Sequence, residues 1–408
     1  MTVRVEKQHA KIDSPSWAIE RYLLQVLYRR LGRPKVDFTL WDGYRLGTEG
    51  VGPNLFIHHR RAFWRLLIRP DLHFGEDYTR GTLSIEGGLL AFLEAIYFGR
   101  ARVSDNQTSK QHKRAKLRPL YSIKLRKAKQ NASHHYDMGN DFYRLWLDKD
   151  MVYTCAYFPQ VELNIEQAQQ AKMEHICRKL QLKAGETVFE AGCGWGALSL
   201  YMARHYGVKV KAYNVSAAQI KEARRRAKAQ GLEHAVEFIE DDYRTIQGQC
   251  DAFVSVGMLE HVGPSNYTQL GEVIDRTLAA YGRGLIHSIA QNQPDPTSPW
   301  IQKYIFPDGY SPTLREMMDI FEPMNLSIVD LENLRLHYAM TLRHWLRRFE
   351  AHRDEIAAMY DEDFVRMWRL YLCGSIANFT TGNLQLYQIL FQRPDLAELP
   401  ITRAHLYR

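Results

Sequence analysis

The sequence predicts an α/β fold built on a doubly wound, mainly parallel sheet with an antiparallel edge. Three observations lead to this prediction. Apolar Val188 and Phe189 run into a glycine-rich turn, and a helical segment follows the turn. Strands and helices then alternate along the chain, which is typical of a parallel sheet covered by helices. Near the C-terminus, a strand-like segment over residues 384–390 favours the antiparallel edge.

Residues 1–103 are predicted to form a small α+β domain. A helix is expected over residues 13–31, because apolar side chains recur there near the helical period. Ser14 and Pro15 are suited to its start. Turn-forming residues then indicate a strand-rich stretch. The remaining expected elements are a helix, a strand and an apolar run, over 60–68, 82–85 and 89–96. The domain suits a lipid-docking or accessory role, and a packing subdomain is an equal alternative.

The main domain is predicted over residues 131–408. An amphipathic helix over 164–180 leads into the glycine-rich turn. We expect the ligand crevice at the carboxyl ends of the parallel strands. The elements expected after the turn are strands over 208–213, 235–239, 251–256 and 283–289, and helices over 216–230, 266–279 and 361–377.

A basic segment over residues 104–130 separates the two predicted domains. From Arg100 to Lys129, eleven Lys or Arg residues stand against one acid, Asp105. A charge run of this kind is usually a solvated linker. It also suits attraction to an anionic membrane surface. A nucleic-acid arm is disfavoured because no nucleic-acid-binding motif accompanies the run, so we expect no nucleic-acid partner.

The composition is that of a soluble globular protein with a large core, since 45% of the 408 residues are hydrophobic and 25% are charged. No stretch approaches the ~20 apolar residues of a membrane span, and the N-terminus lacks the apolar run of a signal peptide. The net charge of +8 allows an anionic partner. The five cysteines are scattered, so we expect no metal site and a reduced, cytoplasmic compartment.

The glycine-rich turn predicts a nucleotide cofactor, because glycines let the backbone approach a ligand closely. Its spacing also fits the dinucleotide pattern. However, the next strand ends at Asn214, where an NAD-binding fold places an acid, and Glu190 instead precedes the first glycine. Glu190 can meet the cationic end of S-adenosylmethionine (SAM). We therefore expect SAM, and a purely structural turn is the alternative.

Several blocks in order along the chain carry a more specific signal. They include Gly192-Cys193-Gly194-Trp195-Gly196, Glu260-His261-Val262-Gly263-Pro264 and Tyr304-Ile305-Phe306-Pro307, with further blocks over 135–141 and 153–157. On these residues the sequence resembles the cyclopropane-fatty-acyl-phospholipid synthases, within the wider family that includes mycolic-acid cyclopropane synthases. The resemblance runs from about His135 to the C-terminus, and more weakly through residues 15–100.

The resemblance implies a class I SAM-dependent methyltransferase, a Rossmann-like doubly wound sheet with an antiparallel edge and a small N-terminal domain. It also implies methylene addition across a cis double bond of an unsaturated phospholipid acyl chain. Such chemistry needs a dry, apolar site and a placed base. In the family the base is a bound bicarbonate. Residue by residue, its site matches Cys155, Glu260, His287, Ile289 and Tyr338.

The same resemblance places SAM. Asn214 stands where the family usually has threonine, and its amide can still bond a ribose hydroxyl. Ser375 stands where the family often has a second cysteine, while Cys373 lies two residues away. We interpret Ser375 as a pocket-wall substitution. The cofactor-binding positions are Tyr153, Thr154, Glu190, Gly192, Cys193, Gly194, Gly196, Asn214, Gln219, Asp242 and Tyr243.

The implied partner is an unsaturated phospholipid in an anionic membrane surface, with the protein peripheral on the cytoplasmic face of the inner membrane. The resemblance is compatible with a homodimer, although no interface is legible in the sequence. Three alternatives stay open. They are a lipid C-methyltransferase that makes methyl- or methylene-branched chains, a small-molecule N-methyltransferase, and a non-enzymatic lipid-binding protein. Each proposed base-site residue, taken alone, also suits ordinary core packing.

Overall fold

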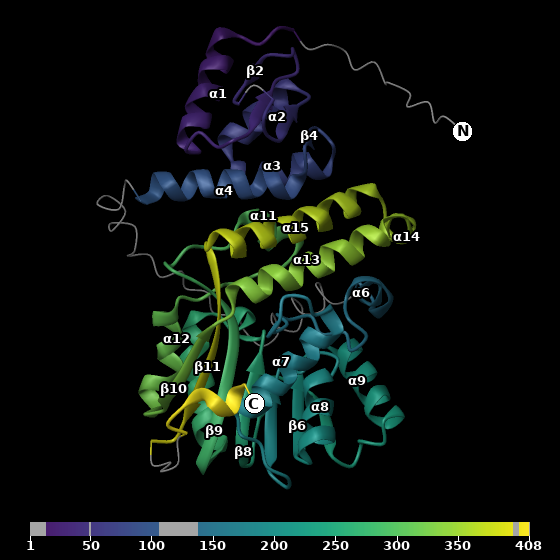
Figure 1. The fold of residues 1–408 in the computed structure, drawn as a ribbon, viewed down its shortest axis with the longest axis vertical. Helices are drawn as coiled ribbons and strands as arrows, with labels where there is room; N and C mark the ends of the chain where they lie inside the picture. Colours follow the sequence, from purple (N-terminus) through teal and green to yellow (C-terminus); the bar gives the residue numbers. More distant parts are fainter. Residues whose placement is uncertain (1–13, 49, 106–137, 395–399, 408) are drawn as a thin grey trace. The chain divides into compact units, whose positions relative to one another are not determined.

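The computed structural model describes residues 14–48, 50–105, 138–394 and 400–407, and these form two compact units (Figure 1). One unit comprises Met1–Lys113 with Tyr360–Ala377, and the other comprises Arg114–Met359 with Asn378–Arg408. Most of the basic segment over 104–130, and residues 135–137 of the first family block, lie outside the described residues. No helix in the described part of the chain is long and apolar enough to cross a membrane.

The first unit contains a four-stranded sheet in the order β2-β1-β3-β4. The β1–β3 pair is parallel, and the other two pairs are antiparallel. Its strands are β1 (Asp37–Thr39), β2 (Arg45–Leu46), β3 (Asn54–Ile57) and β4 (Leu83–Glu86). Its first four helices are α1 (Ala18–Arg30), α2 (Arg60–Ile68), α3 (Pro70–Thr79) and α4 (Leu89–Asp105). The sheet and helices confirm the α+β prediction, although α1 starts later than expected because Trp17 and Glu20 form its N-terminal cap.

A late segment of the chain completes the first unit. Helix α15 (Glu362–Thr381) contributes its residues through Ala377. Arg366 Nε donates to the carbonyl of Tyr78 at 2.7 Å, Nη2 donates to that of Leu83 at 3.0 Å, and the guanidinium stacks on the Tyr78 ring. The sequence places residues 360–377 in the main domain, whereas their contacts group them with residues 1–113. Ser375 and Cys373 therefore belong to the first unit.

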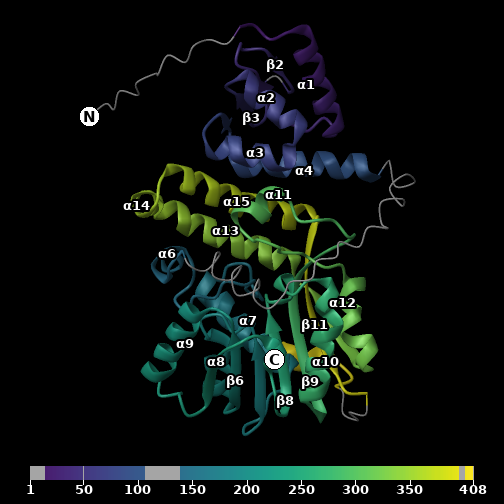
Figure 2. The same cartoon turned by 180° about the vertical axis from the view of Figure 1, so that it is seen from behind.

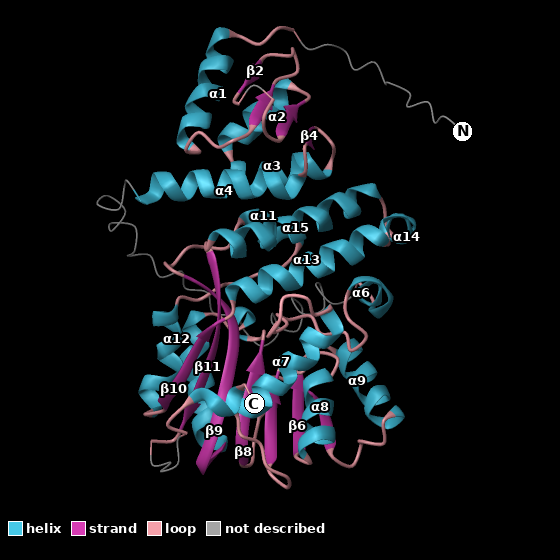
Figure 3. Ribbon diagram, viewed as in Figure 1, coloured by secondary structure: helices cyan, strands magenta, loops and turns pink. Residues whose placement is uncertain are grey.

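The second unit is organised around a seven-stranded sheet in the order β10-β11-β9-β8-β5-β6-β7 (Figure 3). The five strands from β9 to β7 are parallel, and β11 and β10 are antiparallel additions. The parallel strands confirm the doubly wound fold, whose strand order reverses between β5 and β8. The strands are β5 (Thr187–Ala191), β6 (Lys209–Asn214), β7 (Val236–Glu240), β8 (Cys250–Val256), β9 (Leu278–Gln291), β10 (Ser327–Asn333) and β11 (Leu384–Gln392).

The predicted edge strand is wrong in one respect. The segment over 384–390 forms β11, which is antiparallel as expected, but it lies inside the sheet, and β10 forms the edge. The acids Asp330 and Glu332 interrupt the apolar pattern of β10, so the sequence did not predict a strand there. These carboxylates are paired, since Lys179 Nζ lies 2.6 Å from Glu332 Oε2 and Arg403 Nε lies 2.5 Å from Asp330 Oδ2.

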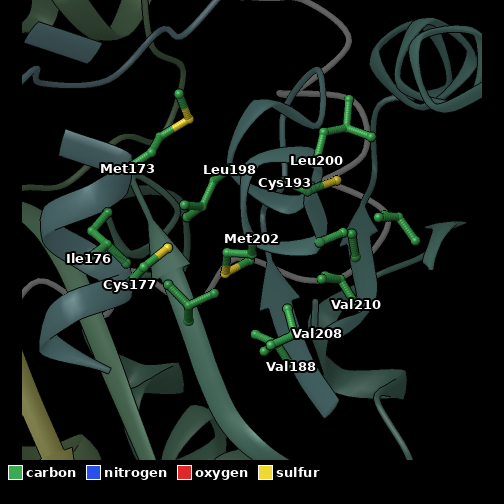
Figure 4. Close-up of a cluster of buried hydrophobic side chains, with 14 of the residues drawn as sticks. Met173, Ile176, Cys177, Val188, Cys193, Leu198, Leu200, Met202, Val208 and Val210 are labelled. Atoms are coloured by element: carbon green, nitrogen blue, oxygen red, sulfur yellow. The ribbon is translucent and has the colours of Figure 1, made fainter. Parts of the chain in front are cut away.

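Helices cover both faces of this sheet. Successive residues of a strand point to opposite faces, and Val188 and Phe189 accordingly belong to different core clusters. Helices α7 (Ile165–Lys179), α8 (Ala197–Tyr206) and α9 (Ala217–Ala229) pack on the Val188 face, whose buried side chains Figure 4 shows. Helices α10 (Tyr267–Thr277) and α12 (Leu314–Phe321) pack on the Phe189 face (Figure 2).

Several helices of the second unit were not predicted. Helix α13 (Arg335–Ala351) buries Leu342, Trp345 and Phe349 at helical spacing, but Arg and His residues between them conceal the pattern. The described residues of this unit also form three short α-helices, namely α6 (Asn140–Trp146), α11 (Pro299–Tyr304) and α14 (Arg353–Met359).

Candidate active site

A cleft opens at the carboxyl ends of the parallel strands, at the place where the strand order reverses. Ten of the eleven positions expected to bind SAM line it. They are Tyr153, Thr154, Glu190, Gly192, Cys193, Gly194, Asn214, Gln219, Asp242 and Tyr243. The eleventh, Gly196, does not line the cleft.

The three glycines of the turn have different roles, although all adopt positive φ. The amides of Gly192 and Cys193 donate to the carbonyl of Tyr213 at 2.8 and 3.1 Å, which ties the turn to β6. A Cβ atom on Gly194 would meet no atom within 4 Å, so its backbone is open to a ligand. A Cβ atom on Gly196 would lie 2.5 Å from Phe238, so this glycine permits close packing under the turn.

Glu190 is buried at the end of β5 and faces the cleft. Ser199 Oγ donates to its Oε2 atom. Burial is the largest influence on this carboxyl group and raises its pKa to about 7. A cationic ligand would stabilise the ionised form, so this carboxyl group is suited to the positive end of SAM.

The far end of the cleft carries amide and aromatic groups. Asn214 Nδ2 donates to Gln219 Oε1 at 2.7 Å, which fixes both amides after β6. Asp242 is buried after β7 and accepts the backbone amide of Arg244 at 3.0 Å. The guanidinium of Arg244 lies 5.1 Å from the centre of the Tyr243 ring. The β6 and β7 ends therefore offer groups that suit a ribose and an adenine.

The segment over residues 152–158 runs from the cleft toward the expected base site. Helix α7 holds one side of it, because Gln169 Nε2 donates to the carbonyl of Thr154 at 2.9 Å and Tyr157 N donates to that of Ala168 at 3.1 Å. Helix α13 holds the other side, where Thr341 Oγ1 accepts the amide of Ala156 at 3.0 Å. Tyr153 and Thr154 thus face the cleft, and Cys155 follows directly.

Backbone and side-chain contacts link four of the five expected base-site residues, and none of the five lines the cleft. Ile289 N donates to Glu260 Oε1 at 2.6 Å, and Ile289 pairs with Leu386 across β9 and β11. Leu334 N donates to the carbonyl of Leu386 at 2.8 Å. Two further expected residues, Cys155 and Tyr338, converge on the Leu334 carbonyl, through Sγ at 4.0 Å and the backbone amide at 3.1 Å.

His287 is the fifth member. It stands two residues before Ile289 on β9, so both side chains lie on one face of the strand. Gln388 Nε2 lies 3.1 Å from its Nδ1 atom, which leaves the proton on Nε2. Burial lowers the pKa of His287 well below its ordinary value, so the ring is neutral. We refer to Cys155, Glu260, His287, Ile289 and Tyr338 as the base cluster.

Two buried polar atoms of the base cluster have no hydrogen-bond partner in the described part of the chain, namely Glu260 Oε2 and His287 Nε2. Burial raises the pKa of Glu260 to about 7 and that of the Cys155 thiol far above its ordinary range. The thiol is therefore a protonated donor and not a nucleophile. Glu260 Oε2 and His287 Nε2 thus keep unused hydrogen-bonding capacity, whereas the Cys155 thiol already donates to the carbonyl of Ala156 at 3.1 Å.

Buried aromatic rings pack against Tyr153, which lines the cleft. The Tyr153 ring lies 5.4 Å from Tyr143, 5.3 Å from Trp146 and 5.4 Å from Trp345, centre to centre. Tyr338 lies 4.6 Å from Phe379. No role for Tyr143, Trp146 or Trp345 was predicted from the sequence, although the aromatic pair Phe142-Tyr143 was an available signal.

Three further polar side chains near the site were not predicted from the sequence. They are Gln169 and Lys172 on α7 and Gln388 on β11. On α7 a usable signal existed, because Gln169, Lys172 and His175 recur three residues apart and all are buried. Polar residues at that spacing on the core-facing side of a helix are unusual and indicate a polar contact there.

Comparisons with known proteins identify the family. The family model of mycolic acid cyclopropane synthetase matches residues 123–389. The cyclopropane-fatty-acyl-phospholipid synthase of Escherichia coli K12 is 39% identical over 85% of this chain and 90% of its own. A probable fatty acid methyltransferase of Pseudomonas putida is 35% identical over 90% and 95%. The crystal structure of the mycolic acid cyclopropane synthase CmaA1 with SAH and CTAB has a TM-score of 0.62 and 26% identity, over 68% of this chain and 99% of that one.

The fold, the cleft and these relatives lead to one conclusion. The chain belongs to the mycolic acid cyclopropane synthetase family and is a SAM-dependent methyltransferase.

Proposed function

We propose that this protein adds a methylene group, derived from the methyl group of SAM, across a cis double bond of unsaturated phospholipid acyl chains and so forms a cyclopropane. One observation supports the proposal: Tyr153 and Thr154 line the SAM cleft, and the next residue along the chain, Cys155, is a buried member of the base cluster. An alkene is a poor nucleophile, so it must be held in line with an activated methyl group.

SAM supplies that methyl group as part of a sulfonium ion. We assign its methionyl end to Glu190 and the glycine turn, its ribose to Asn214 and Gln219, and its adenine to Asp242 and Tyr243. The burial of Glu190 and Asp242, and the open backbone at Gly194, support this placement. Tyr153 and Thr154, which line the same cleft, would then contact the part of the cofactor that carries the reactive methyl group.

The base cluster fits a bicarbonate ion. Glu260 Oε2 and His287 Nε2 are buried without partners in the described residues, and these two atoms support the fit; the Cys155 thiol already donates to the carbonyl of Ala156. His287 is neutral and Glu260 has a pKa of about 7, so the cluster adds little negative charge that would repel an anion. When bound, bicarbonate would supply the acceptor for the proton that the alkylated acyl chain loses.

The aromatic rings around Tyr153 suit the same reaction. Methyl transfer to an alkene leaves a cation on the acyl chain, and water would capture it. Tyr143, Trp146 and Trp345 are fully buried and form a dry aromatic wall behind Tyr153. Their ring faces also carry negative charge density, which favours a nearby cation.

We place the protein at an anionic membrane surface on the cytoplasmic side of the inner membrane. The net charge of +8 and the basic segment over 104–130 support this placement. We assign lipid docking to the first unit and catalysis to the second. Phospholipid with cis double bonds is the substrate that this location supplies.

The test is incubation of the full chain with SAM, bicarbonate and vesicles of mono-unsaturated, anionic phospholipid. Fatty acids are then released and analysed by mass spectrometry and NMR. Cyclopropane protons and a mass gain of one methylene group are the expected result. Turnover of a free amine, with none of the vesicle lipid, would contradict the proposal and favour a small-molecule N-methyltransferase.

A second candidate is a lipid C-methyltransferase that makes methyl- or methylene-branched chains. The match to a probable fatty acid methyltransferase of Pseudomonas putida favours it. Both activities use the same alkylation step and differ in which proton the cation loses. A branched methyl signal in place of cyclopropane protons, in the same NMR experiment, would select this candidate.

A further inference from the structure

Lys172 is a buried lysine on α7 that the proposed chemistry does not yet use. Its side chain lines the SAM cleft and is 2% exposed. The Nζ atom donates to Thr154 Oγ1 at 2.9 Å, which is its one hydrogen-bond partner among the described residues. An ammonium group has three donors. Two of them are therefore available to a ligand.

Lys179 lies two turns after Lys172 on the same face of α7, and its polar partners differ from those of Lys172. Lys179 is also buried, but its Nζ lies 2.6 Å from Glu332 Oε2 and 3.8 Å from Asp330 Oδ1. Lys172 has no carboxylate within 4 Å in the described part of the chain, although Asp148 and Glu190 are near enough to interact with it electrostatically. A buried charge without a close counter-ion is costly, so its retention indicates a function.

The state of Lys172 fits a role toward an anion. Burial is the largest influence on its ammonium group and lowers its pKa to about 8. The side chain is therefore mostly protonated at neutral pH. Lys172 and Glu190 both line the cleft, and each shifts the pKa of the other toward its charged form. This end of the cleft thus presents one cation and one acid.

SAM has matching groups at its methionyl end, an ammonium and a carboxylate. Glu190 suits the ammonium. Two long-chain cations line the cleft in the described structure, and Arg244 lies at the other end, beside Asp242 and over Tyr243. Lys172 is accordingly the cation at the Glu190 end.

We propose that Lys172 binds the carboxylate of SAM. The assignment rests on the placement of SAM proposed above. It gives the cofactor two charged contacts of opposite sign, which fix the direction in which the sulfonium methyl points. The competing view is that Lys172 only anchors Thr154 and the segment that follows it.

Decarboxylated SAM separates these views, because it keeps the sulfonium and the ammonium but lacks the carboxylate. Binding of SAM and of decarboxylated SAM to the full chain is measured by isothermal titration calorimetry. We expect the wild type to bind SAM about 10- to 100-fold more tightly, as for a hydrogen bond between charged groups. In Lys172→Met and Lys172→Gln this preference should fall to about one.

5′-Methylthioadenosine, which lacks the whole amino-acid end, serves as the folding control. It should bind the wild type and both Lys172 variants equally. Lys172→Gln retains a donor for Thr154 Oγ1, so it keeps the test valid if Lys172→Met does not fold. Lys179→Met is the matched control for loss of a buried lysine from α7, and it should keep the full preference for SAM.

Two results would overturn the assignment. In one, the Lys172 variants retain the wild-type preference for SAM. In the other, they lose affinity for SAM, decarboxylated SAM and methylthioadenosine in equal proportion, which is the signature of an anchor. If the wild type bound none of the three ligands, the cofactor placement itself would fall, and the assignment with it.

Discussion

The SAM cleft and the base cluster lie side by side in one unit, but they are built in different ways. Turns after consecutive parallel strands form most of the cleft, so its residues lie close together in short stretches of sequence. The base cluster draws on the loop after β8, on β9, on α13 and on the segment over 152–158. The residues for cofactor binding thus lie in short stretches of sequence, whereas the proposed proton transfer depends on residues that only long-range packing brings together.

Glu260→Gln is expected to separate the functions of the two regions most clearly, because it should affect turnover and not cofactor affinity. Gln retains an oxygen that accepts the amide of Ile289, so the fold should persist. Loss of the carboxyl group should lower turnover of vesicle lipid about a hundredfold to a thousandfold, because the base cluster loses its acid–base group. Affinity for SAH, measured by calorimetry, should stay unchanged.

Glu316→Gln is the matched control. Glu316 caps α12, and a glutamine serves in the same capping motif. Turnover of this variant should be normal. Wild-type turnover of Glu260→Gln would remove Glu260 from the mechanism, and a parallel loss of SAH affinity would show that the two regions are not separable.

On the cleft side, the largest effect is expected on stability, from Gly196→Ala. The backbone at this position has a positive φ, which alanine adopts only with strain. An added Cβ atom would also lie 2.5 Å from Phe238 Cζ. The free energy of unfolding should fall by about 2–5 kcal/mol in urea denaturation. Gly231→Ala also has positive φ but open space around it, so a loss of only about 1–2 kcal/mol is expected. Equal losses would refute the packing role of Gly196.

A smaller effect is expected from Tyr338→Phe. The variant keeps the ring beside Phe379 and Trp345 and removes only the hydroxyl group. Turnover should fall about tenfold, the equivalent of one hydrogen bond to a charged group. The midpoint of urea unfolding should not move. Tyr201→Phe, whose hydroxyl binds Glu174 away from both regions, should retain full turnover; an equal loss there would point to a general effect of removing a buried hydroxyl.

The mildest effect concerns the pH dependence of SAH binding. Burial raises the pKa of Glu190 to about 7, so the carboxyl group is mostly protonated at pH 6 and mostly ionised at pH 7.5. Only the ionised form attracts the ligand ammonium. Affinity should therefore fall about eightfold as the pH drops across this range. Glu190→Gln should bind more weakly at pH 7.5 and show no such fall; a retained fall would assign the titration to another group.

The difference between the two regions also explains what the sequence could reveal. The glycine turn, Glu190, Asn214 and Asp242 follow strands whose apolar pattern is plain, so the fold and the cleft were predicted from local signals. The base cluster was named only through the family resemblance, because no local spacing relates Cys155 to His287. Its role remains a prediction.

Other parts were missed because charge concealed them. Acids on β10 and basic residues on α13 hide the apolar pattern that each element buries. Lys172 was missed for a related reason, since a lysine in an amphipathic helix is usually solvent-exposed. The three-residue spacing of Gln169, Lys172 and His175 was the available signal, and the packing of α7 against the segment over 152–158 shows that Lys172 is buried.

The division of the chain has a consequence for biosynthesis. The first unit needs Tyr360–Ala377, and these residues leave the ribosome long after residue 113. At about 5–20 residues per second, the N-terminal piece waits roughly 10 to 50 seconds for Arg366 to reach the carbonyls of Tyr78 and Leu83. During that interval the nascent N-terminal piece lacks its last helix and exposes the surface that this helix later covers. Chaperone demand during translation is therefore expected to concentrate on this piece of the chain.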